Sequence, residues 1–347
     1  MLDFWKNKRI LVTGHSGFKG AWLSEMLLLA GAEVTGYALK PPTEPALFSL
    51  LRLESRMRSV EGDIRDMEHL MRVFRETRPE FVLHMAAQPI VRTSYERPVY
   101  TYDVNVMGTV NVCECIRQTD SVRSFLNVTT DKVYENSEQG RGFTETDFLD
   151  GYDPYSNSKS CSELVTHSYD KSFLRARGVA VSTARAGNVI GGGDFARDRI
   201  VPDCVRAAAR QEAVVLRNPD SIRPFQHVLE PLAVYLMILE WQLSDGTRAG
   251  AYNVGPDLRD CVKTGELAAL FAKHWGEGFR WEVQPDGGPH EAGFLRLDCG
   301  KLKRSFSWEP KWDIDRAIQE TVRWSKAWIA GEDVTEVTDR QIRAFAV

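Results

Sequence analysis

The segment Arg9–Gly20, RILVTGHSGFKG, joins a short aliphatic run to three closely spaced glycines. Arg9–Thr13 has the length and composition of a buried strand, and Gly14, Gly17 and Gly20 follow it at intervals of three residues. Glycines in a strand-to-helix turn let the backbone bend sharply and approach a diphosphate, whose charge the helix N-terminus stabilises. A plain strand–helix turn would also use such glycines. Their place after an apolar strand predicts a dinucleotide site.

Further apolar runs alternate with amphipathic stretches through the first half of the chain. This alternation predicts parallel strands joined by right-handed helical crossovers, and hence an α/β fold with a doubly wound sheet. Ligands of such sheets bind at the carboxyl ends of the strands. The expected strands are Arg9–Thr13, Glu33–Ala38, Arg58–Gly62, Phe81–Met85, Ser124–Thr129 and Val179–Ala184, and the expected helices are Ala21–Ala30, Met67–Thr77, Val99–Arg117 and Ser156–Arg177.

The alternation ends after about residue 186, where glycines 191–193 and the turns near Pro219 and Pro224 interrupt it. One more strand, Ala251–Gly255, is expected to rejoin the sheet. We therefore predict a nucleotide-binding domain over 1–185 that residues 228–258 rejoin. Residues 186–227 and 259–347 are predicted to form a smaller, mostly C-terminal lobe that binds the substrate.

Composition excludes several classes of protein. The formal charge is −4 and like charges do not cluster, which argues against a nucleic-acid-binding surface. The longest apolar stretches, such as Leu232–Leu239, are too short to cross a bilayer, and the N-terminus lacks the pattern of a secretory signal. The six cysteines form no C-x-x-C pair and the histidines are dispersed. We expect a cytoplasmic protein with reduced thiols and no metal.

Tyr155 and Lys159 are spaced i, i+4, so on a helix they share one face. A neighbouring ammonium lowers the pKa of a phenol, which then acts as a base on a hydroxyl. Such pairs also arise among solvated surface residues. Here the pair follows a strand that ends at Thr130, Asp131 and Lys132, so both segments are expected at the carboxyl edge of the sheet.

Thr130, Asp131 and Lys132 would add a hydroxyl, an acid and a base to the phenol. A dehydrogenase or an epimerase needs only the Tyr/Lys pair and a hydroxyl. An additional acid and base suit a reaction that breaks a C–H and a C–O bond. Alternatively, Asp131 caps a turn and Lys132 is solvated.

Two strand ends support the cofactor site. Asp63 closes the third strand, where its carboxylate accepts from an adenine amine or caps the next helix. Small residues at Ala86 and Ala87 let the backbone lie against a cofactor. The second strand ends in Leu39-Lys40 without the carboxylate that commonly binds the ribose diol. Lys40, or Lys19 in the glycine turn, could therefore meet the 2′-phosphate of NADP.

These motifs resemble a known superfamily. T-G-x-x-G-F-x-G together with Y-x-x-x-K resembles the extended short-chain dehydrogenases/reductases, which have a Rossmann-type fold. Thr-Asp-Lys-Val-Tyr at 130–134 resembles the nucleotide-sugar 4,6-dehydratases. The lysine in that run, with Gly14–Trp22 and Arg223–Pro231, is similar to the branch of these dehydratases that acts on CDP-glucose. The likeness extends from Phe4 to Pro310.

The resemblance implies a mechanism. Tyr155, held by Lys159 and assisted by Thr130, removes the proton of the sugar 4-hydroxyl as hydride passes from C4 to NAD. Asp131 then protonates the C6 hydroxyl while Lys132 removes the C5 proton. Hydride finally returns to C6, giving a 4-keto-6-deoxy sugar. Because each turnover regenerates the oxidised cofactor, we expect NAD rather than NADP.

The resemblance also carries over the site residues. The expected catalytic residues are Thr130, Asp131, Lys132, Tyr155 and Lys159. The expected cofactor contacts are Gly14, His15, Gly17, Phe18, Lys19, Gly20, Asp63, Ile64, Ala86, Ala87, Gln88, Asn105, Thr129, Tyr155 and Lys159. The expected contacts with CDP-glucose are Thr130, Asn188, Arg199, Arg217, Arg223, His227 and Arg296. Each arginine taken singly could be a surface charge, and Arg223 is favoured for the diphosphate because guanidinium binds two oxygens at once.

Two other functions stay open: an epimerase of the same superfamily, and a non-catalytic nucleotide sensor on the same fold. The segments Val99–Arg117 and Ser156–Arg177 resemble the helix pair through which family members form a homodimer. The same helices must also cover the sheet.

Overall fold

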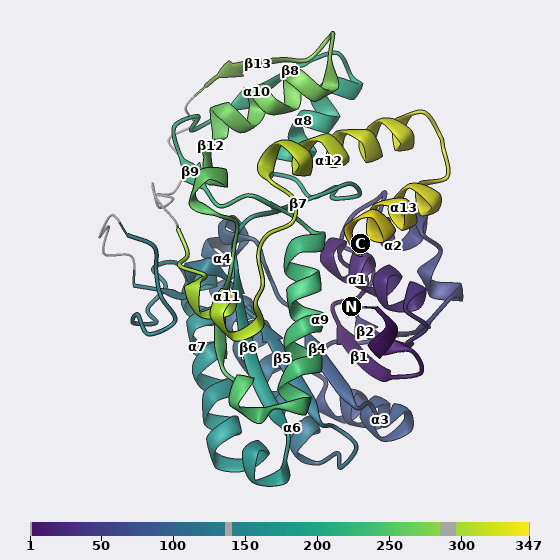
Figure 1. Ribbon diagram of the computed structural model, residues 1–347, viewed down its shortest axis with the longest axis vertical. Coiled ribbons are helices and arrows are strands. Elements are labelled where there is room, and N and C mark those ends of the chain that lie inside the picture. Colours follow the sequence, from purple (N-terminus) through teal and green to yellow (C-terminus); the bar gives the residue numbers. More distant parts are fainter. Residues whose placement is uncertain (1, 136–140, 285–295, 347) are drawn as a thin grey trace.

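The computed structural model describes residues 2–135, 141–284 and 296–346, and its centre is a seven-stranded sheet (Figure 1). The strands are β1 (Arg9–Thr13), β2 (Glu33–Ala38), β3 (Arg58–Glu61), β4 (Phe81–His84), β5 (Ser124–Val128), β6 (Ala180–Ala186) and β11 (Ala251–Val254). Their spatial order is β11-β6-β5-β4-β1-β2-β3, and every neighbouring pair is parallel. The order reverses between β1 and β4, which confirms the predicted doubly wound α/β fold.

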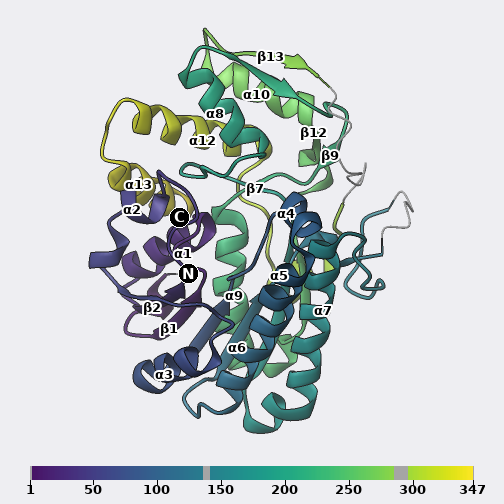
Figure 2. The ribbon, with the colours of Figure 1, turned by 180° about the vertical axis from the view of Figure 1, so that it is seen from behind.

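Helices cover both faces of this sheet (Figures 1 and 2). One face carries α1 (Phe18–Leu29) and α9 (Leu229–Ser244), and the other carries α3 (Met67–Thr77), α6 (Gly108–Arg117) and α7 (Pro154–Tyr169). Side chains of a strand alternate between faces. Accordingly, Ile10 and Val12 of β1 join the core beneath α1 and α9, whereas Leu11 joins the core beneath α3 and α6.

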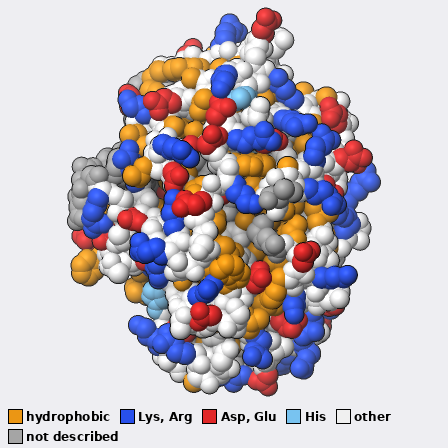
Figure 3. Space-filling model, viewed as in Figure 1, with side chains coloured by type: hydrophobic (Ala, Val, Ile, Leu, Met, Phe, Trp, Pro, Cys, Tyr) orange, Lys and Arg blue, Asp and Glu red, His pale blue; other side chains and the backbone are white. Residues whose placement is uncertain are grey.

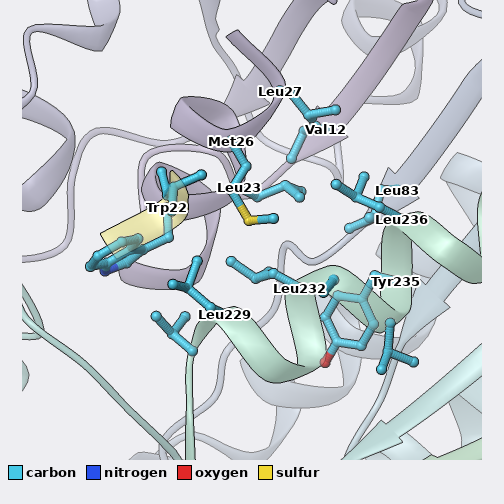
Figure 4. Close-up of a cluster of buried hydrophobic side chains, with 14 of the residues drawn as sticks. Val12, Trp22, Leu23, Met26, Leu27, Leu83, Leu229, Leu232, Tyr235 and Leu236 are labelled. Atoms are coloured by element: carbon cyan, nitrogen blue, oxygen red, sulfur yellow. The ribbon is translucent and has the colours of Figure 1, made fainter. Parts of the chain in front are cut away.

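The core between α1 and α9 is large and aromatic. Figure 4 shows Trp22 and Met26 of α1 facing Leu229 and Leu232 of α9. Trp22 is fully buried and its indole N–H donates to the carbonyl of Gly192 at 2.9 Å. This contact anchors the first helix to the segment that leaves the sheet after β6.

The segment predicted as one helix over Val99–Arg117 has a different backbone. It consists of α5 (Pro98–Tyr102), a π-helical turn over Asp103–Met107, and α6. Another short helix, α4 (Val91–Glu96), precedes it. π-Helical turns are found often at functional sites, and the hydrophobic period does not reveal them.

The remaining elements form a smaller lobe at one end of the sheet (Figure 1). It contains α8 (Ile200–Ala209), α10 (Thr264–Trp275), α12 (Ile314–Ile329) and three two-stranded sheets. These sheets pair β7 (Val189–Ile190) with β10 (Gln226–His227), β8 (Ala213–Leu216) with β13 (Arg280–Val283), and β9 (Ile222–Arg223) with β12 (Val262–Lys263). Apolar residues of α8, β8, α10 and α12 form the core of the lobe.

Three further helices lie against the sheet layer. A short α2 (Leu47–Leu50) contacts α1, and α11 (Gly300–Phe306) contacts β11. The last helix, α13 (Val334–Ala346), contacts both α12 and α1, and its Phe345 lies in the same core as Trp22. The division of the chain into two domains at the predicted boundaries stays a prediction.

Charged side chains of both signs are interspersed over the face seen in Figure 3. Within the described ranges, the helices lack the length and apolar character that a membrane crossing requires. The same ranges hold no group of three or more His, Cys, Asp or Glu side chains that could bind a metal ion.

Candidate active site

The glycine turn between β1 and α1 is packed against its neighbours. Gly14 has a φ of +78°, and a Cβ at this position would lie 2.8 Å from the amide nitrogen of Ala86. A Cβ at Gly20 would lie 2.2 Å from the carbonyl oxygen of Gly14. Gly17 is the N-cap of α1 and no side chain caps the helix there. The missing Cβ atoms of Gly14 and Gly20 thus let the turn pack closely on itself and on Ala86, and the first amide groups of α1 have no side-chain cap, as in helix N-termini that bind phosphates.

The carboxyl ends of β1 and β4 are joined by one hydroxyl. Thr13 Oγ1 accepts from the amides of Met85 at 3.1 Å and Ala86 at 3.2 Å, and it lies 2.7 Å from Nδ1 of His84. Burial lowers the pKa of His84 to about 3, and the charge of Lys159 lowers it further, so the imidazole is neutral. The backbone of Ala86 is thereby held at the point where the strand order reverses.

Asn105 fixes the loop that follows β4. Its Oδ1 accepts from the amide of Gln88 at 2.8 Å, and its Nδ2 donates to the carbonyl of Gln88 and to the hydroxyl of Ser158 on α7. Asn105 is buried and lies in the π-helical turn. Asn105 therefore fixes the loop of Ala87 and Gln88 through hydrogen bonds to the backbone of Gln88.

The far side of the turn carries His15 and Asp63. His15 is buried, its Nε2 lies 2.8 Å from the Ser59 hydroxyl, and burial lowers its pKa to about 4. Asp63 accepts from the amide and the guanidinium of Arg65, and these bonds lower its pKa. Ile64 is buried beside it. The residue that caps α3 is Asp66, so the alternative reading of Asp63 as that cap is wrong.

Local sequence determines where α7 begins and thus where its functional residues lie. The Asp153 carboxylate accepts from the amide of Ser156 at 3.0 Å, and Pro154 occupies the first helical position. Tyr155 and Lys159 follow on one face and both are buried. This N-cap therefore places the Tyr/Lys pair against the end of β5.

A 3-10 turn over Asp131–Val133 directly follows β5 and contacts α7. The Ser160 hydroxyl donates to the carbonyl of Val133 at 2.7 Å, and Gly151 donates its amide to the same hydroxyl at 3.1 Å. A Cβ on Gly151 would lie 2.7 Å from the carbonyl oxygen of Lys132. These close contacts hold the turn beside the first turns of α7.

The structure brings Tyr155 and Thr130 together. Burial raises the Tyr155 pKa to about 12, although a hydrogen bond with Thr130 acts in the opposite direction. Lys159 donates to the carbonyl of Val128 at 3.1 Å, and burial lowers its pKa to about 8 while Glu163 raises it. In the ligand-free protein, burial thus opposes the phenolate that the sequence predicts.

Asp131 and Lys132 form an ion pair. Lys132 Nζ lies 3.0 Å from Asp131 Oδ1, and the Thr130 hydroxyl donates to the same oxygen at 3.0 Å. The other oxygen, Oδ2, is buried without a hydrogen-bond partner. A Cβ on Gly187 would lie 3.3 Å from it. The turn is capped by the Thr130 hydroxyl, which accepts from the amide of Lys132, and the Asp131 carboxylate presents one oxygen beside Gly187. Asn188 Oδ1 is also buried without a partner, so both oxygens can accept from a ligand hydroxyl.

Sequence reasoning missed Glu163, which continues the face of Tyr155 and Lys159 by one more turn. Its carboxylate accepts from Thr129 at 2.5 Å and from Arg185 at 2.9 Å, and all three residues are buried. Burial favours the neutral carboxyl, but Arg185 and the hydroxyls together lower the pKa of Glu163. The spacing Tyr-x₃-Lys-x₃-Glu was a signal that could have found it.

Tyr235 was also missed, since it lies within the apolar run that forms α9. Lys19 Nζ lies 3.3 Å from its hydroxyl. Burial, together with the charges of Lys159 and Arg199, lowers the pKa of Lys19 to about 7. The amine of Lys19 is therefore close to the Tyr/Lys pair.

The predicted arginines occupy several places. Arg199 bonds Asp194 at 3.0 Å, and its charge acts on Lys19 and on Tyr155, which places it beside the centre. Arg217 bonds Asp198 at 2.7 Å. The structure thus brings Arg199 near the catalytic residues.

The other predicted substrate contacts lie in the lobe or in the core. Arg223 is buried in β9, and the carbonyl of Arg296 accepts from the amide of Phe143 at 2.9 Å. His227 is fully buried between Trp22 and Trp312, where burial lowers its pKa to about 3. The structure thus brings His227 to the core rather than to the catalytic residues.

Comparison with known proteins agrees with the geometry of the site. A family model described as GDP-mannose 4,6 dehydratase matches residues 11–321. The chain belongs to the GDP-mannose 4,6 dehydratase family. This member is 44% identical over 349 residues to the CDP-glucose 4,6-dehydratase of Salmonella typhimurium strain LT2, with 99% of this chain and 97% of that protein covered.

Solved structures confirm the fold of this GDP-mannose 4,6 dehydratase family member. The UDP-glucose 4-epimerase of Thermus thermophilus, in complex with NAD, is 28% identical with a TM-score of 0.77 and covers 92% of this chain and 99% of its own. The dTDP-glucose 4,6-dehydratase of Bacillus anthracis strain Ames, also in complex with NAD, is 22% identical with a TM-score of 0.76 and covers 92% and 96%. The predicted resemblance to the nucleotide-sugar 4,6-dehydratases is confirmed.

Proposed function

We propose that this chain is an NAD-dependent hydro-lyase that converts CDP-D-glucose to CDP-4-dehydro-6-deoxy-D-glucose and water. One observation carries the proposal. The oxidation pair of Tyr155 and Thr130 lies beside Asp131, a buried carboxylate that has a lysine on one oxygen and no partner on the other. Oxidation at C4 needs only Tyr155, Lys159 and the Thr130 hydroxyl, whereas loss of water from C5–C6 also needs an acid and a base. Sequence identity of 44% to a CDP-glucose 4,6-dehydratase supports the same reaction.

The glycine turn fits a dinucleotide. At Gly14 and Gly20 a side chain would collide with backbone, and the amide groups at the start of α1 are uncapped. We assign the diphosphate of NAD to Gly17 and Phe18, and the rest of the cofactor to the expected contacts on the loops after β3 and β4. When bound, NAD supplies hydride transfer: it accepts hydride from C4 and returns it to C6.

The oxidation step uses the end of α7. Tyr155 Oη takes the proton of the sugar 4-hydroxyl, with Thr130 bonded to both the phenol and Asp131. Burial raises the Tyr155 pKa to about 12 in the ligand-free chain, so the phenolate needs an additional positive charge. Protonated Lys159, held at the carbonyl of Val128, provides one such charge.

The elimination step uses the turn after β5. In the proposed cycle, Asp131 delivers a proton to the C6 hydroxyl and Lys132 removes the proton from C5. Their ion pair at 3.0 Å lets one proton move from the amine to the carboxylate, which would leave a neutral base beside a neutral acid.

For the nucleotide part of the substrate, we propose Asn188 and Arg199 as contacts beside the catalytic residues. Arg217, Arg223 and Arg296 stay predictions for the diphosphate and the base. CDP selectivity rests on the relative's name and on the sequence resemblance. His227 stays a prediction that its burial does not favour.

Mass spectrometry tests the proposal. The chain is incubated with NAD and, in parallel, with CDP-, TDP-, UDP- and GDP-glucose. Loss of one water from CDP-glucose is expected. A new stereoisomer of unchanged mass would instead indicate an epimerase, and unchanged substrate with nucleotide bound would indicate a sensor. Tyr155→Phe should abolish the reaction, whereas its matched control Tyr152→Phe, at a position that is 85% exposed, should not.

We also propose a homodimer formed through the helices seen in Figure 2. Large apolar side chains are exposed along α4 to α7, among them Tyr95, Val99, Met107 and Leu164. Val99 is 83% exposed, whereas Thr101 on the same short helix is fully buried. Analytical ultracentrifugation at micromolar concentration should give twice the chain mass for the wild type. Leu164→Arg should give a monomer, and a monomeric wild type would contradict the proposal.

A further inference from the structure

The 3-10 turn over Asp131–Val133 is held at both of its ends. Before it, the Thr129 hydroxyl donates to one oxygen of Glu163 at 2.5 Å. After it, Tyr134 ends the turn, and its hydroxyl accepts from Arg185 at 2.8 Å. Arg185 also donates to the other oxygen of Glu163 at 2.9 Å. These four residues, the Glu163–Arg185 network, therefore close a ring of hydrogen bonds around the turn.

The Glu163–Arg185 network is shielded from solvent. Thr129, its most exposed residue, is only 6% exposed. The Tyr134 hydroxyl also donates to Asn253 of β11 at 2.5 Å. Hydrogen bonds of this kind have little water to exchange with, so they hold a single geometry. A buried ion pair adds little net stability compared with apolar side chains of the same volume. The contribution of this network is therefore the geometry that it imposes on the turn.

The residues for oxidation are held by other contacts. Lys159 lies one helical turn before Glu163 on α7, and its amine donates to the carbonyl of Val128 at 3.1 Å. The N-cap of α7 fixes the helix directly before Tyr155. These contacts do not pass through Tyr134, so the Tyr/Lys pair should keep its place when the Tyr134 hydroxyl is removed. The turn after β5, by contrast, ends at Tyr134 itself.

We propose that Tyr134 is a positioning residue for the elimination step. Through the network it holds Asp131 and Lys132 at the C5–C6 bond of the sugar, while α7 holds the oxidation residues at C4. The proposal rests on the function proposed above, and it adds that the two chemical steps depend on separate sets of contacts. Weakening the network should therefore slow loss of water and leave hydride transfer from C4 unchanged.

Tyr134→Phe removes the hydroxyl and keeps the ring. The ring stacks on Phe143 with centres 4.9 Å apart, and Ser160 still donates to the carbonyl of Val133, so the turn should stay folded but less tightly held. A displacement of about 1 Å in a catalytic group lowers its rate about 100-fold. With part of the support left, loss of water should slow about tenfold to 100-fold, and oxidation at C4 should change less than about twofold.

Stopped-flow absorbance of the reduced nicotinamide separates the two steps when the full-length, NAD-loaded chain is mixed with CDP-glucose in a single turnover. The signal rises as hydride leaves C4 and falls as hydride returns to C6 after water is lost. Quenched samples analysed by mass spectrometry give the rate of water loss. Tyr252→Phe is the matched control, because Tyr252 is also buried and its hydroxyl donates to the carbonyl of Arg248, outside the network.

In Tyr134→Phe the signal should rise within about twofold of the wild-type rate and fall about tenfold to 100-fold more slowly. Tyr252→Phe should behave as the wild type. Arg185→Lys keeps a charge beside Glu163 but loses the guanidinium that bonds both partners, so it should give the pattern of Tyr134→Phe.

Equal slowing of the rise and the fall in Tyr134→Phe would indicate a merely structural role and overturn the proposal. Wild-type water loss by Tyr134→Phe or by Arg185→Lys would also overturn it. A wild type that neither reduces NAD nor loses water would instead refute the proposed function, and the inference with it. The two failures are therefore told apart by the behaviour of the wild type.

Discussion

Gly17→Ala and Gly20→Ala, both in the turn after β1, should have different effects on stability and on NAD binding. At Gly20 the new Cβ would lie 2.2 Å from the Gly14 oxygen and 2.6 Å from the His15 Cα. Both are backbone atoms, so α1 must shift by about 1 Å to restore ordinary contact. At Gly17 the nearest atom, the Gly14 oxygen, is at 3.5 Å, and φ is −79°, so alanine fits the ligand-free protein.

The expected sizes follow from these contacts. Because both clashing atoms are backbone, the overpacking cost should lie at the upper end, about 3 kcal/mol, and the helical preference of alanine returns about 1 kcal/mol, so Gly20→Ala should lose about 2 kcal/mol. An unfolding entropy of about 0.7 kcal/mol/K for a chain of 347 residues converts this to a fall of about 3 °C in Tm. Gly17→Ala should leave the Tm of the nucleotide-free protein within about 1 °C. It should raise the Kd for NAD at least about tenfold, because its methyl group lies where the diphosphate approaches the helix.

Differential scanning fluorimetry without nucleotide and calorimetric titration of NAD separate the two effects. The reasoning fails if Gly17→Ala lowers the nucleotide-free Tm as much as Gly20→Ala does. It also fails if Gly17→Ala binds NAD as tightly as the wild type.

Three more changes test other parts of the structure. Burial and a hydrogen bond to Glu25 raise the Asp339 pKa to about 6, so this group stabilises the fold at low pH and its contribution is lost as the pH rises from about 4 through 6. Asp339→Asn should therefore be more stable than the wild type at pH 7 by about 1 kcal/mol, a figure that is discounted for the partial exposure of Asp339. Urea unfolding at pH 7 measures the difference, and no gain in the free energy of unfolding would refute this. Lys132→Met should slow exchange of the C5 hydrogen with deuterated water at least about 100-fold while NAD binding is kept, and exchange at the wild-type rate would rule out its role as the base. Glu163→Gln should lower the free energy of unfolding by about 3–5 kcal/mol, because Arg185 is left buried without its carboxylate partner. A decrease below about 1 kcal/mol in thermal unfolding would contradict this.

Much of the sheet was predictable because its strands are short aliphatic runs bounded by glycines and charges. Both Arg9–Thr13 and Glu33–Ala38 have the same bounds in sequence and structure. The first helix begins at Phe18, three residues before the expected start, because Gly17 rather than a polar side chain caps it. The π-helical turn around Asn105 was not predictable, since it leaves the amphipathic pattern of the segment almost unchanged.

The residues of the candidate site also differ in how far the sequence could predict them. Tyr155 and Lys159 could be found because their relation is local, one helical turn. Tyr235 could not, since 216 residues separate it from Lys19 and only the packing of α9 on α1 brings the two together. His227 is the opposite case, a residue that the sequence resemblance places at the site and the structure places in the core. It lies within a run that resembles the family, yet two tryptophans enclose it in the core.

The contact of α13 with α1 also bears on the order in which the protein can acquire its native packing during synthesis. Chains fold on the ribosome from the N-terminus onward. Val337, Ile342 and Phe345 of α13 belong to the same buried core as Trp22 of α1, although α13 is translated long after α1. During synthesis, the apolar surface of α1 that contacts α13 therefore stays uncovered until α13 has been translated.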